Sequence, residues 1–472
     1  MSATDPALMP AEELLAHYAR RALSPVEVLK AVTERVARLN PDINAFAVMN
    51  PRSLEAAGES EARWAAGRPR GLLDGVPVTV KDLVDLAGFP TRRGSRLTDP
   101  APVAEDAPSV LGLKEQGAVV IGKTTTAEFG WKSPGDCPLH GITRNPWNKL
   151  HTPGGSSSGA GAAAAAGFGP LHLGTDGGGS IRIPAAWCGV VGLKPSFGRV
   201  PLWPHGAFAQ VAVAGPITRS VRDAALMLSA IARFDLRDPF CLPPEAHAGA
   251  AGEPRDWRAG IEDGVAEMRV AVLRRPGFEA PVDWEGIAAV EQAAQLLTEA
   301  GAEVEEVDPE LPDTRAIFSQ VWGAALTRLV NSFPETRRHM LDPGLLAVAT
   351  AHEGVPAAAL LEAEAQRLIA AHTMARLHQR YDLVLCPTVP NLAPLADATQ
   401  GDPAEALWTN WAPWTFAFNL TRQPAISVPM GLAANGLPRA VQIVAALYRD
   451  DLVLRAARTL EVAQPFGLPE LD

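Results

Sequence analysis

Two glycine–serine clusters lie close together in the chain, and their residue types favour catalytic chemistry. The first cluster spans residues 154–159 (GGSSSG), and the second spans residues 177–180 (GGGS). A flexible linker would account for one cluster, but not for the second or for the apolar sequence between them. Small residues allow two backbones to approach closely, and glycines let main-chain N–H groups converge on one point. The pattern favours a hydroxyl nucleophile beside a ring of backbone donors.

A lysine at the end of an apolar segment could supply the base that such a hydroxyl needs. Apolar residues alternate through Val76, Val78 and Val80, which predicts a strand that ends at Lys81. A lone lysine is most often a solvated surface charge. Here the apolar flanks would remove the side chain from water, which favours the neutral amine and makes it a base. At this point both explanations remain open.

Two shorter motifs offer competing functions. Residues 117–124 (GAVVIGKT) match the phosphate-loop pattern of nucleotide-binding proteins, but the four residues between the glycines are themselves the best strand nearby. Residues 155–159 (GSSSG) match the GxSxG nucleophile motif of esterases, but a turn-like sequence precedes them where a buried strand is required. A nucleotide-binding protein and a GxSxG esterase therefore stay as remote alternatives.

Composition narrows the class of protein. The chain has 472 residues, 47% of them hydrophobic and 20% charged, and a formal net charge of −11, which argues against nucleic-acid binding. The absence of a signal-peptide pattern and of a long apolar stretch predicts a cytoplasmic protein without membrane spans. The cysteines form no CxxC pair and the histidines no HExxH motif, so we expect neither a metal site nor a disulfide framework.

The elements that must position these residues alternate between helix and strand. Helical spacing over residues 10–39, with Ser24 as an N-cap, is followed by a strand at 44–49 and a helix at 53–66. After Gly215 we expect a loop that enters a helix capped by Thr218 or Ser220. Strands are predicted at 268–273, 302–307, 383–386, 425–429 and 440–446, and helices at 284–300, within 315–378 and at 450–463. This alternation predicts an α/β fold with a mixed sheet.

Taken together, these segments resemble one known family. With Lys81, the GGSSSG cluster and TDGGGSIRIPAAWCGVVGLKPSFGRVP in place, the chain resembles the amidase signature family of serine hydrolases. The most specific agreement covers about residues 71–219, and weaker agreement extends over nearly the whole chain. The resemblance implies a single α/β domain with a twisted mixed sheet of about eleven strands flanked by helices. Its parts would be a helical region (1–66), a catalytic core (67–235), a surface connection (236–267) and a C-terminal part (268–472).

The resemblance also implies a reaction and its catalytic groups. Ser180 would be the nucleophile that forms an acyl-enzyme, Ser156 a bridging serine preceded by a cis peptide bond, and Lys81 the base. The bond cleaved would be an amide, anilide or carbamate, as in aryl acylamidases and urethanases, without a cofactor or metal. The expected oxyanion hole is made by the main-chain N–H groups of Gly177, Gly178, Gly179 and Ser180. Many family members carry a side chain at the first of these glycine positions. Asp176 and Arg182 are expected to tie down this loop.

The sequence says less about the substrate and the residues that bind it. Tryptophans at 408, 411 and 414 recur every three residues, for which core packing is the commoner explanation and an aromatic pocket wall the alternative. The pocket candidates are Phe129, Trp131, Trp203, Phe208, Trp408 and Trp411. They favour a small aryl or hydrophobic amide or carbamate as the substrate. We expect the chain to be a monomer or a homodimer. The other family function, an A-type subunit of a tRNA-dependent glutamine amidotransferase, remains an alternative.

Overall fold

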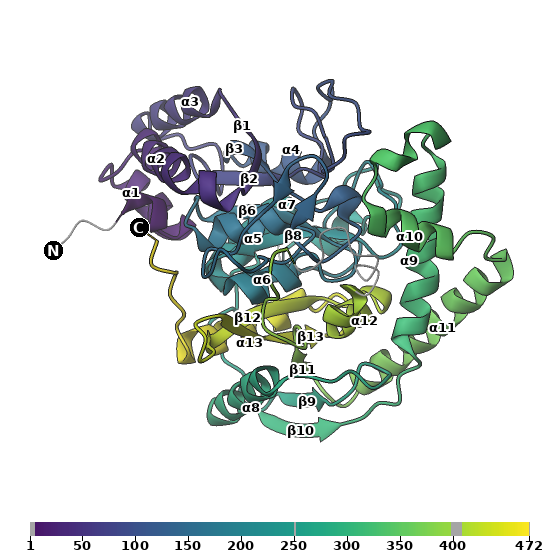
Figure 1. The fold of residues 1–472 in the computed structure, drawn as a ribbon. Coiled ribbons are helices and arrows are strands. Elements are labelled where there is room, and N and C mark those ends of the chain that lie inside the picture. Colours follow the sequence, from purple (N-terminus) through teal and green to yellow (C-terminus); the bar gives the residue numbers. More distant parts are fainter. Residues whose placement is uncertain (1–4, 250–251, 398–407, 472) are drawn as a thin grey trace.

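A computed structural model describes residues 5–249, 252–397 and 408–471. In this part of the chain one mixed sheet of 11 strands, in the order β1-β3-β2-β6-β8-β7-β12-β13-β11-β9-β10, runs through the molecule (Figure 1). Its strands are β1 (Phe46–Met49), β2 (Pro77–Lys81), β3 (Val119–Thr124), β6 (Leu171–Asp176), β7 (Val191–Lys194), β8 (Val213–Thr218), β9 (Arg269–Leu273), β10 (Glu303–Val307), β11 (Leu383–Pro387), β12 (Ala425–Leu432) and β13 (Pro438–Ala445). A separate short ribbon pairs β4 (Asp136–Cys137) with β5 (Gly141–Ile142). The α/β class and the single large mixed sheet are as predicted.

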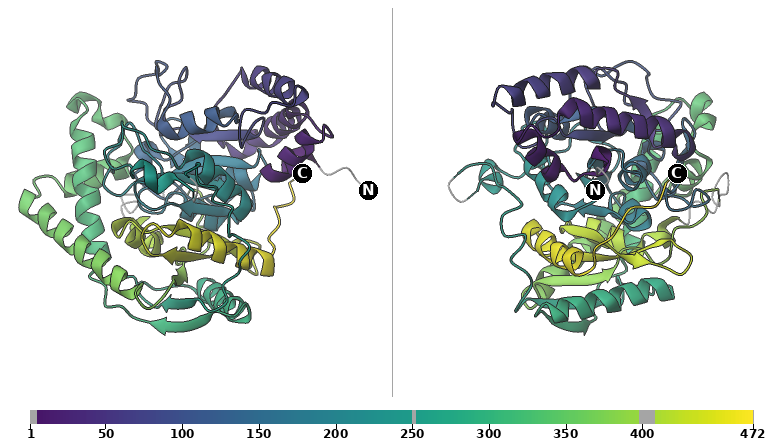
Figure 2. Two further views of the ribbon diagram at one scale, coloured as in Figure 1. Left: turned by 180° about the vertical axis from the view of Figure 1, so that it is seen from behind. Right: turned by 90° about the vertical axis from the view of Figure 1, so that its left-hand side faces the viewer.

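Helices cover both faces of the sheet and one side of the molecule. The α-helices are α1 (Ala11–Ala19), α2 (Pro25–Ile43), α3 (Ser53–Ala65), α4 (Pro108–Glu115), α5 (Ser158–Ala165), α6 (Arg182–Cys188), α7 (Val221–Ile231), α8 (Trp284–Glu299), α9 (Thr314–Asn331), α10 (Pro343–Ala351), α11 (Ala357–Leu377), α12 (Pro413–Leu420) and α13 (Asp450–Ala463). Short 3₁₀ turns are η1 (Pro6–Leu8), η2 (Glu128–Gly130), η3 (Pro244–His247) and η4 (Glu335–Met340). Helices α9, α10 and α11 stand together at one side of the sheet (Figures 1 and 2).

The alternation of strand residues decides which groups face the catalytic side. In β2, Val78 and Val80 pack into the largest hydrophobic cluster together with residues of α4, α7 and α13. Successive side chains of a strand point to opposite faces, so Thr79 and Lys81 face the other side, where α5 and α6 pack. In β6, Leu171 joins the same hydrophobic cluster as the two valines. One face of the sheet thus forms an apolar core and the other receives the polar groups of the site.

Two predicted segments differ from the structure. The segment from Gly215, expected to be a loop, begins inside β8 (Val213–Thr218). This strand lies between β6 and β7, because both neighbouring strands offer main-chain partners. Pro216 lies within this strand and pairs with Leu173. The predicted surface connection 236–267, apart from residues 250–251 outside the described part, contributes Trp257, Ile261 and Val265 to the main core. The sequence pattern did not predict the burial of these two regions, because it depends on contacts with elements that are distant in the chain.

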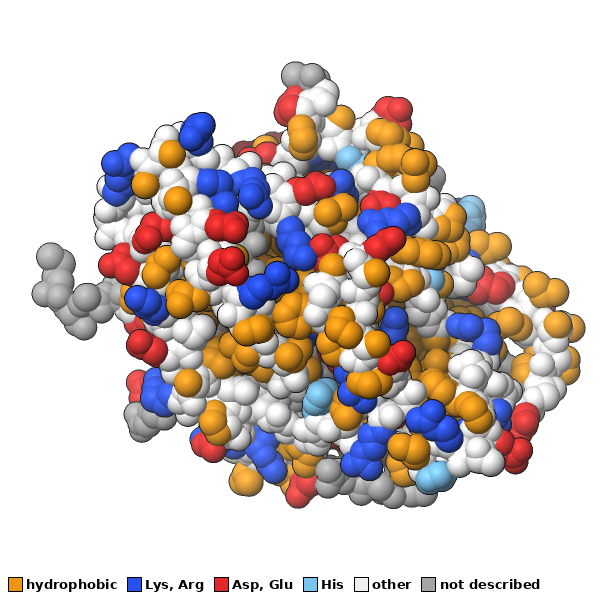
Figure 3. All heavy atoms as spheres, turned by 90° about the horizontal axis from the view of Figure 1, so that it is seen from above, with side chains coloured by type: hydrophobic (Ala, Val, Ile, Leu, Met, Phe, Trp, Pro, Cys, Tyr) orange, Lys and Arg blue, Asp and Glu red, His pale blue; other side chains and the backbone are white. Residues whose placement is uncertain are grey.

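The outer surface shows no broad area of one charge on the face seen from above. Acidic and basic side chains are intermixed there (Figure 3). Within the described residues, no helix combines the length and the apolar character that a bilayer span requires. The same part of the chain contains no group of three or more His, Cys, Asp or Glu residues arranged to hold a metal ion.

Candidate active site

The predicted base is buried at the end of β2. Lys81 Nζ lies 2.8 Å from Ser156 Oγ and 3.0 Å from Thr175 Oγ1, and the lysine side chain is fully buried. Burial lowers the pKa of Lys81 well below its ordinary value, and the negative charge of Asp176 only partly opposes this effect. Burial therefore shifts the amine toward its neutral form, which is the form that can accept a proton.

Ser156 belongs to the first glycine–serine cluster, directly before α5. The peptide bond between Gly155 and Ser156 is cis. A Cβ atom at position 155 would lie 2.7 Å from the carbonyl oxygen of Ser133 and 2.8 Å from that of Pro134, so only glycine fits there. This close approach holds the segment in place beside Lys81.

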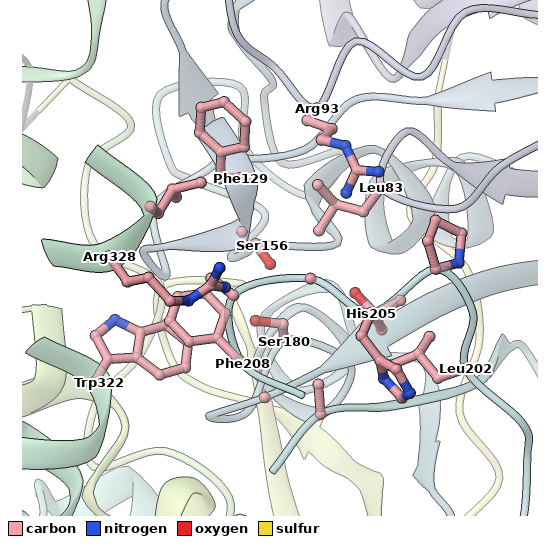
Figure 4. Close-up of a pocket in the computed structure, with 18 residues that line it drawn as sticks. Leu83, Arg93, Phe129, Ser156, Ser180, Leu202, His205, Phe208, Trp322 and Arg328 are labelled. Atoms are coloured by element: carbon pink, nitrogen blue, oxygen red, sulfur yellow. The ribbon is translucent and has the colours of Figure 1, made fainter. Parts of the chain in front are cut away.

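The second cluster brings Ser180 to the same place. The main-chain N–H of Ser157 donates to the carbonyl oxygen of Ser180 at 3.2 Å, which ties the two clusters together. Ser180 is 8% exposed and lines the same pocket as Ser156. Figure 4 shows both hydroxyl groups turned into the pocket space. The three residues that the sequence singled out are thus brought to one site.

A buried ion pair fixes the loop that carries Ser180. Arg182 Nε and Nη2 each donate to one oxygen of Asp176 at 2.9 Å, and both side chains are fully buried. Asn419 Nδ2 and the main-chain N–H groups of Gly179 and Ile181 also donate to the carboxylate of Asp176. Burial alone would raise the pKa of Asp176, but the charge and hydrogen bonds of Arg182 hold it well below its ordinary value. The expectation that this pair anchors the loop is confirmed.

The loop that leads to Ser180 carries main-chain N–H groups at each of its three glycines. Because the Gly179 N–H donates to Asp176 at 2.8 Å, it is engaged in anchoring the loop. In the described part of the chain, the N–H groups of Gly177, Gly178 and Ser180 donate to no protein atom. A Cβ atom at 178 would lie 2.9 Å from the Phe318 ring, so this loop requires small residues. Main-chain donors without a protein acceptor, next to a serine hydroxyl, are the kind of group that can bind a developing oxyanion.

Comparison with known proteins assigns the family. The profile of the family described as Amidase matches residues 27–454. The chain is 34% identical over 466 residues to an acylamidase of Rhodococcus erythropolis, covering 97% of this chain and 96% of that protein. It is also 31% identical to a glutamyl-tRNA(Gln) amidotransferase subunit of Picosynechococcus sp., covering 93% and 95%. The solved structure of a bacterial aryl acylamidase of the amidase signature family superposes with a TM-score of 0.88 at 29% identity, covering 97% of each chain.

The chain belongs to the amidase signature family. This family contains amide hydrolases, and the predicted resemblance and fold are confirmed. The match extends over nearly the whole length of both the relatives and the solved structure.

The pocket of this amidase has aromatic walls. Its volume is about 270 Å³, near the lower end for small-molecule sites. Phe129 and Phe208 line it, as predicted, together with Trp322 from α9. The rings of Phe208 and Trp322 stack with centroids 3.5 Å apart and an interplanar angle of 4° (Figure 4). The two stacked rings therefore form an apolar wall beside Ser156 and Ser180.

The other four predicted wall residues lie elsewhere, and that part of the prediction needs correction. Trp131 is fully buried in the core, and Trp408 packs behind the wall against Trp322 and Phe318. Trp203 is 40% exposed, and its neighbours Leu202 and Pro204 reach the pocket in its place. Trp411 packs against Trp187, edge to face. Core packing, the commoner explanation for regularly spaced tryptophans, holds for this group.

The two competing motifs have structural explanations. Lys123, the lysine of the phosphate-loop pattern, is fully buried on β3 and forms an ion pair with Asp82 at 2.9 Å. The central serine of GSSSG, Ser157, exchanges hydrogen bonds with the main chain of Thr175 and is buried. Neither side chain is free to bind a nucleotide or to attack a substrate.

Several site residues were not found from the sequence. Thr175, the second partner of Lys81, directly precedes the Asp-Gly cluster, so its position next to the motif was an available signal. Trp322 and Arg328 come from α9, and Arg93 and His205 come from loops. Nothing in their local sequence distinguishes them from ordinary helix or loop residues, because only the tertiary fold brings them to the pocket.

Proposed function

We propose that this chain hydrolyses a carbon–nitrogen amide-type bond through an acyl-enzyme on Ser180. The proposal rests above all on the 2.8 Å contact between the Lys81 amine and Ser156 Oγ. The amine is buried, which lowers its pKa, and Ser156 lines the same pocket as Ser180. Ser180 Oγ attacks the carbonyl carbon of the substrate. Its proton passes to Ser156 Oγ, and Ser156 passes its own proton to Lys81 Nζ. The N–H groups of Gly177, Gly178 and Ser180 stabilise the negative oxygen that forms.

The second half of the reaction reverses the proton path. The proton on Lys81 returns through Ser156 to the leaving nitrogen, the C–N bond breaks, and the amine departs. Water then attacks the acyl group on Ser180, with the same pair accepting its proton. Release of the carboxylic acid restores the Ser180 hydroxyl. All proton transfers are supplied by side chains of this chain.

The aromatic wall supports aryl amides, anilides or aryl carbamates as the substrate class. The stacked Phe208 and Trp322 rings and the side chain of Phe129 present apolar surface next to the reacting serines. The relative from Rhodococcus erythropolis is named an acylamidase, and a solved neighbour is an aryl acylamidase. A small anilide such as 4-nitroacetanilide is a suitable first probe, because release of 4-nitroaniline is seen directly.

Substitution of serines in the two clusters tests the assignment of the nucleophile. We expect Ser180→Ala to lower kcat at least about a thousandfold on 4-nitroacetanilide. Ser158→Ala is the matched control, since its buried hydroxyl has no hydrogen-bond partner among the described residues and reacts with nothing in this scheme. A sulfonyl fluoride should label Ser180, as seen by peptide mass spectrometry. Full activity of Ser180→Ala, or labelling at Ser157, would instead support the esterase scheme.

A role within a glutamine amidotransferase is the second candidate function. Relatives named as subunits of glutamyl-tRNA(Gln) amidotransferase are 31% to 35% identical to this chain. The purified chain separates the two functions: steady release of amine from anilides without other proteins supports the hydrolase. Turnover restricted to glutamine, and only in the presence of companion subunits, supports the amidotransferase.

A further inference from the structure

The pocket has a charge of opposite sign to the whole chain. Among the residues that the structure describes, its lining includes Arg93, His205 and Arg328 and no aspartate or glutamate, whereas the chain carries a formal net charge of −11. A concave site lined by one sign of charge, with apolar walls, concentrates the field and attracts ligands of the opposite charge. The aromatic wall does not explain why these basic side chains line the pocket.

Arg328 contributes most to the positive charge of the pocket. It lies on α9 and is exposed, and in the described part of the chain its guanidinium makes no hydrogen bond or ion pair. Glu364 lies with Arg328 along a neighbouring groove, but its carboxylate pairs with Arg367 at 2.8 Å. Figure 4 shows the Arg328 guanidinium turned toward the space in front of Ser156 and Ser180. Its donors form a planar fork that fits a carboxylate.

Arg93 adds positive charge from another side of the pocket. Its guanidinium lies 3.8 Å from Asp85, a distance at which the pair only partly neutralises it. Its main-chain carbonyl accepts a hydrogen bond from the N–H of Phe129 at 2.8 Å, so the loop that carries Arg93 is joined to the aromatic wall. In Figure 4 Arg93 and Arg328 approach the pocket from different sides.

We propose that the substrate of this pocket is an amide that carries a carboxylate: Arg328 binds the carboxylate, and the apolar part of the substrate packs against the wall formed by Phe208 and Trp322. This inference rests on the proposed hydrolase function and adds the substrate class. Arg93 raises the positive potential of the pocket, and Arg328 is the residue that determines specificity.

Two matched pairs of substrates test the proposal. The first pair is the 4-nitroanilide of succinic acid and that of 4-methylpentanoic acid, its apolar isostere. The second pair is N-acetylated 4-aminobenzoate and N-acetylated 4-methylaniline, with the charge on the amine side. We expect wild-type protein to prefer the acid in at least one pair by about 10- to 100-fold in kcat/KM, the range for a charge-assisted hydrogen bond. The preference should shrink with added salt.

Variants on two helices separate binding from folding. Arg328→Ala should remove most of the preference, mainly through a higher KM for the acid, so that the acid and the neutral amide are cleaved with similar kcat/KM. Arg328→Lys should restore part of it. Arg376→Ala, which removes the same charge from an exposed position on α11 outside the pocket lining, should have no effect.

The outcomes distinguish the two proposals. Turnover of neutral amides without any preference for an acid, or an acid preference that survives Arg328→Ala, would overturn the inference and leave the hydrolase function intact. If no amide is cleaved, calorimetry with the succinic acid anilide decides: binding that is lost in Arg328→Ala supports the anionic site and counts against the hydrolase function alone. Absence of binding as well overturns the inference.

Discussion

At the scale of single residues, the site depends on removing one lysine from water. Lys81 is buried against Ser156 and Thr175, and burial outweighs the opposing charge of Asp176 in setting its pKa. Lys123, only a strand away on β3, is equally buried but keeps a carboxylate partner, Asp82, at 2.9 Å. The two lysines have similar burial and different partners. Only Lys81 contacts a serine hydroxyl that also lines the pocket.

This difference predicts the pH dependence of the reaction. Lys81 accepts a proton only when neutral, so kcat/KM should rise with pH through the pKa of Lys81 and level off above it. Because burial lowers that pKa, the midpoint of the rise should lie well below the ordinary lysine value of 10.5. The measurement is kcat/KM against pH with a neutral anilide.

Lys81→Arg provides the complementary check, because a guanidinium stays charged over the whole accessible pH range. We expect it to lose at least about a thousandfold in kcat at every pH. A rise in activity with the same midpoint in Lys81→Arg would show that another group controls the profile.

At the scale of elements, α5 holds the two clusters together because it is made of small residues. Every residue of Ser158–Ala165 is buried. A Cβ atom at Gly159 would lie 2.2 Å from the carbonyl oxygen of Ala45 and 2.5 Å from the main-chain nitrogen of Thr125. A Cβ atom at Gly161 would meet Pro184 of α6 at 2.8 Å. The glycines thus set the distance at which α5 packs against the sheet and against α6.

A pair of glycine-to-alanine substitutions tests this packing. Gly159→Ala should lower the free energy of unfolding by at least about 2 kcal/mol, because the new methyl group meets backbone atoms that have little room to move. Gly58→Ala lies inside α3, where an added Cβ meets nothing within 4 Å, and should raise it by about 0.5–1 kcal/mol. Urea unfolding of both variants gives the two values. Equal effects would contradict the packing argument.

At the scale of the whole molecule, the sheet separates an apolar core from a buried polar layer. On β7, Val191 and Leu193 face the main hydrophobic cluster, whereas Lys194 faces the side of Arg182. Burial and the positive charge of Arg182 lower the pKa of Lys194 to about 7, against the opposing effects of Asp176 and Asp450. Lys194 is thus a further buried lysine near the site, without a part in the proposed reaction.

The free energy of unfolding should depend on pH through Lys194. Between pH 7 and 10.5, about the window from the folded pKa to the ordinary value, the unfolded chain binds a proton at Lys194 that the folded chain does not. Stability therefore rises with pH in this window, by about 1.4 kcal/mol per pH unit for one proton. In Lys194→Met this contribution should be absent, so the difference in unfolding free energy between wild type and variant should change with that slope.

Urea unfolding between pH 8 and 9.5 measures the slope. Lys30→Met, on the exposed face of α2, serves as the control for loss of a lysine and should leave the slope unchanged. Parallel pH curves for wild type and Lys194→Met would mean that Lys194 keeps its proton in the folded state.

The sequence by itself determined the fold class, the family and the candidate catalytic trio. The alternation in residues 76–81, the glycines of both clusters and the cap at Ser24 act over a few neighbouring residues, and the structure shows the predicted strand, close backbone approaches and capping box. Lys81, Ser156 and Ser180 could be named because they lie within or beside such local motifs.

Only the tertiary structure decided the walls and the charge of the pocket. Trp322 and Arg328 lie on α9, whose sequence is that of an ordinary helix, and they reach Phe208 because α9 packs against α12 and the loop after β7. Trp131 and Trp408 were plausible wall residues, yet the same packing buries them behind the wall. Local patterns fix elements and backbone conformation, whereas the side chains that meet across a cavity depend on contacts between segments far apart in the chain.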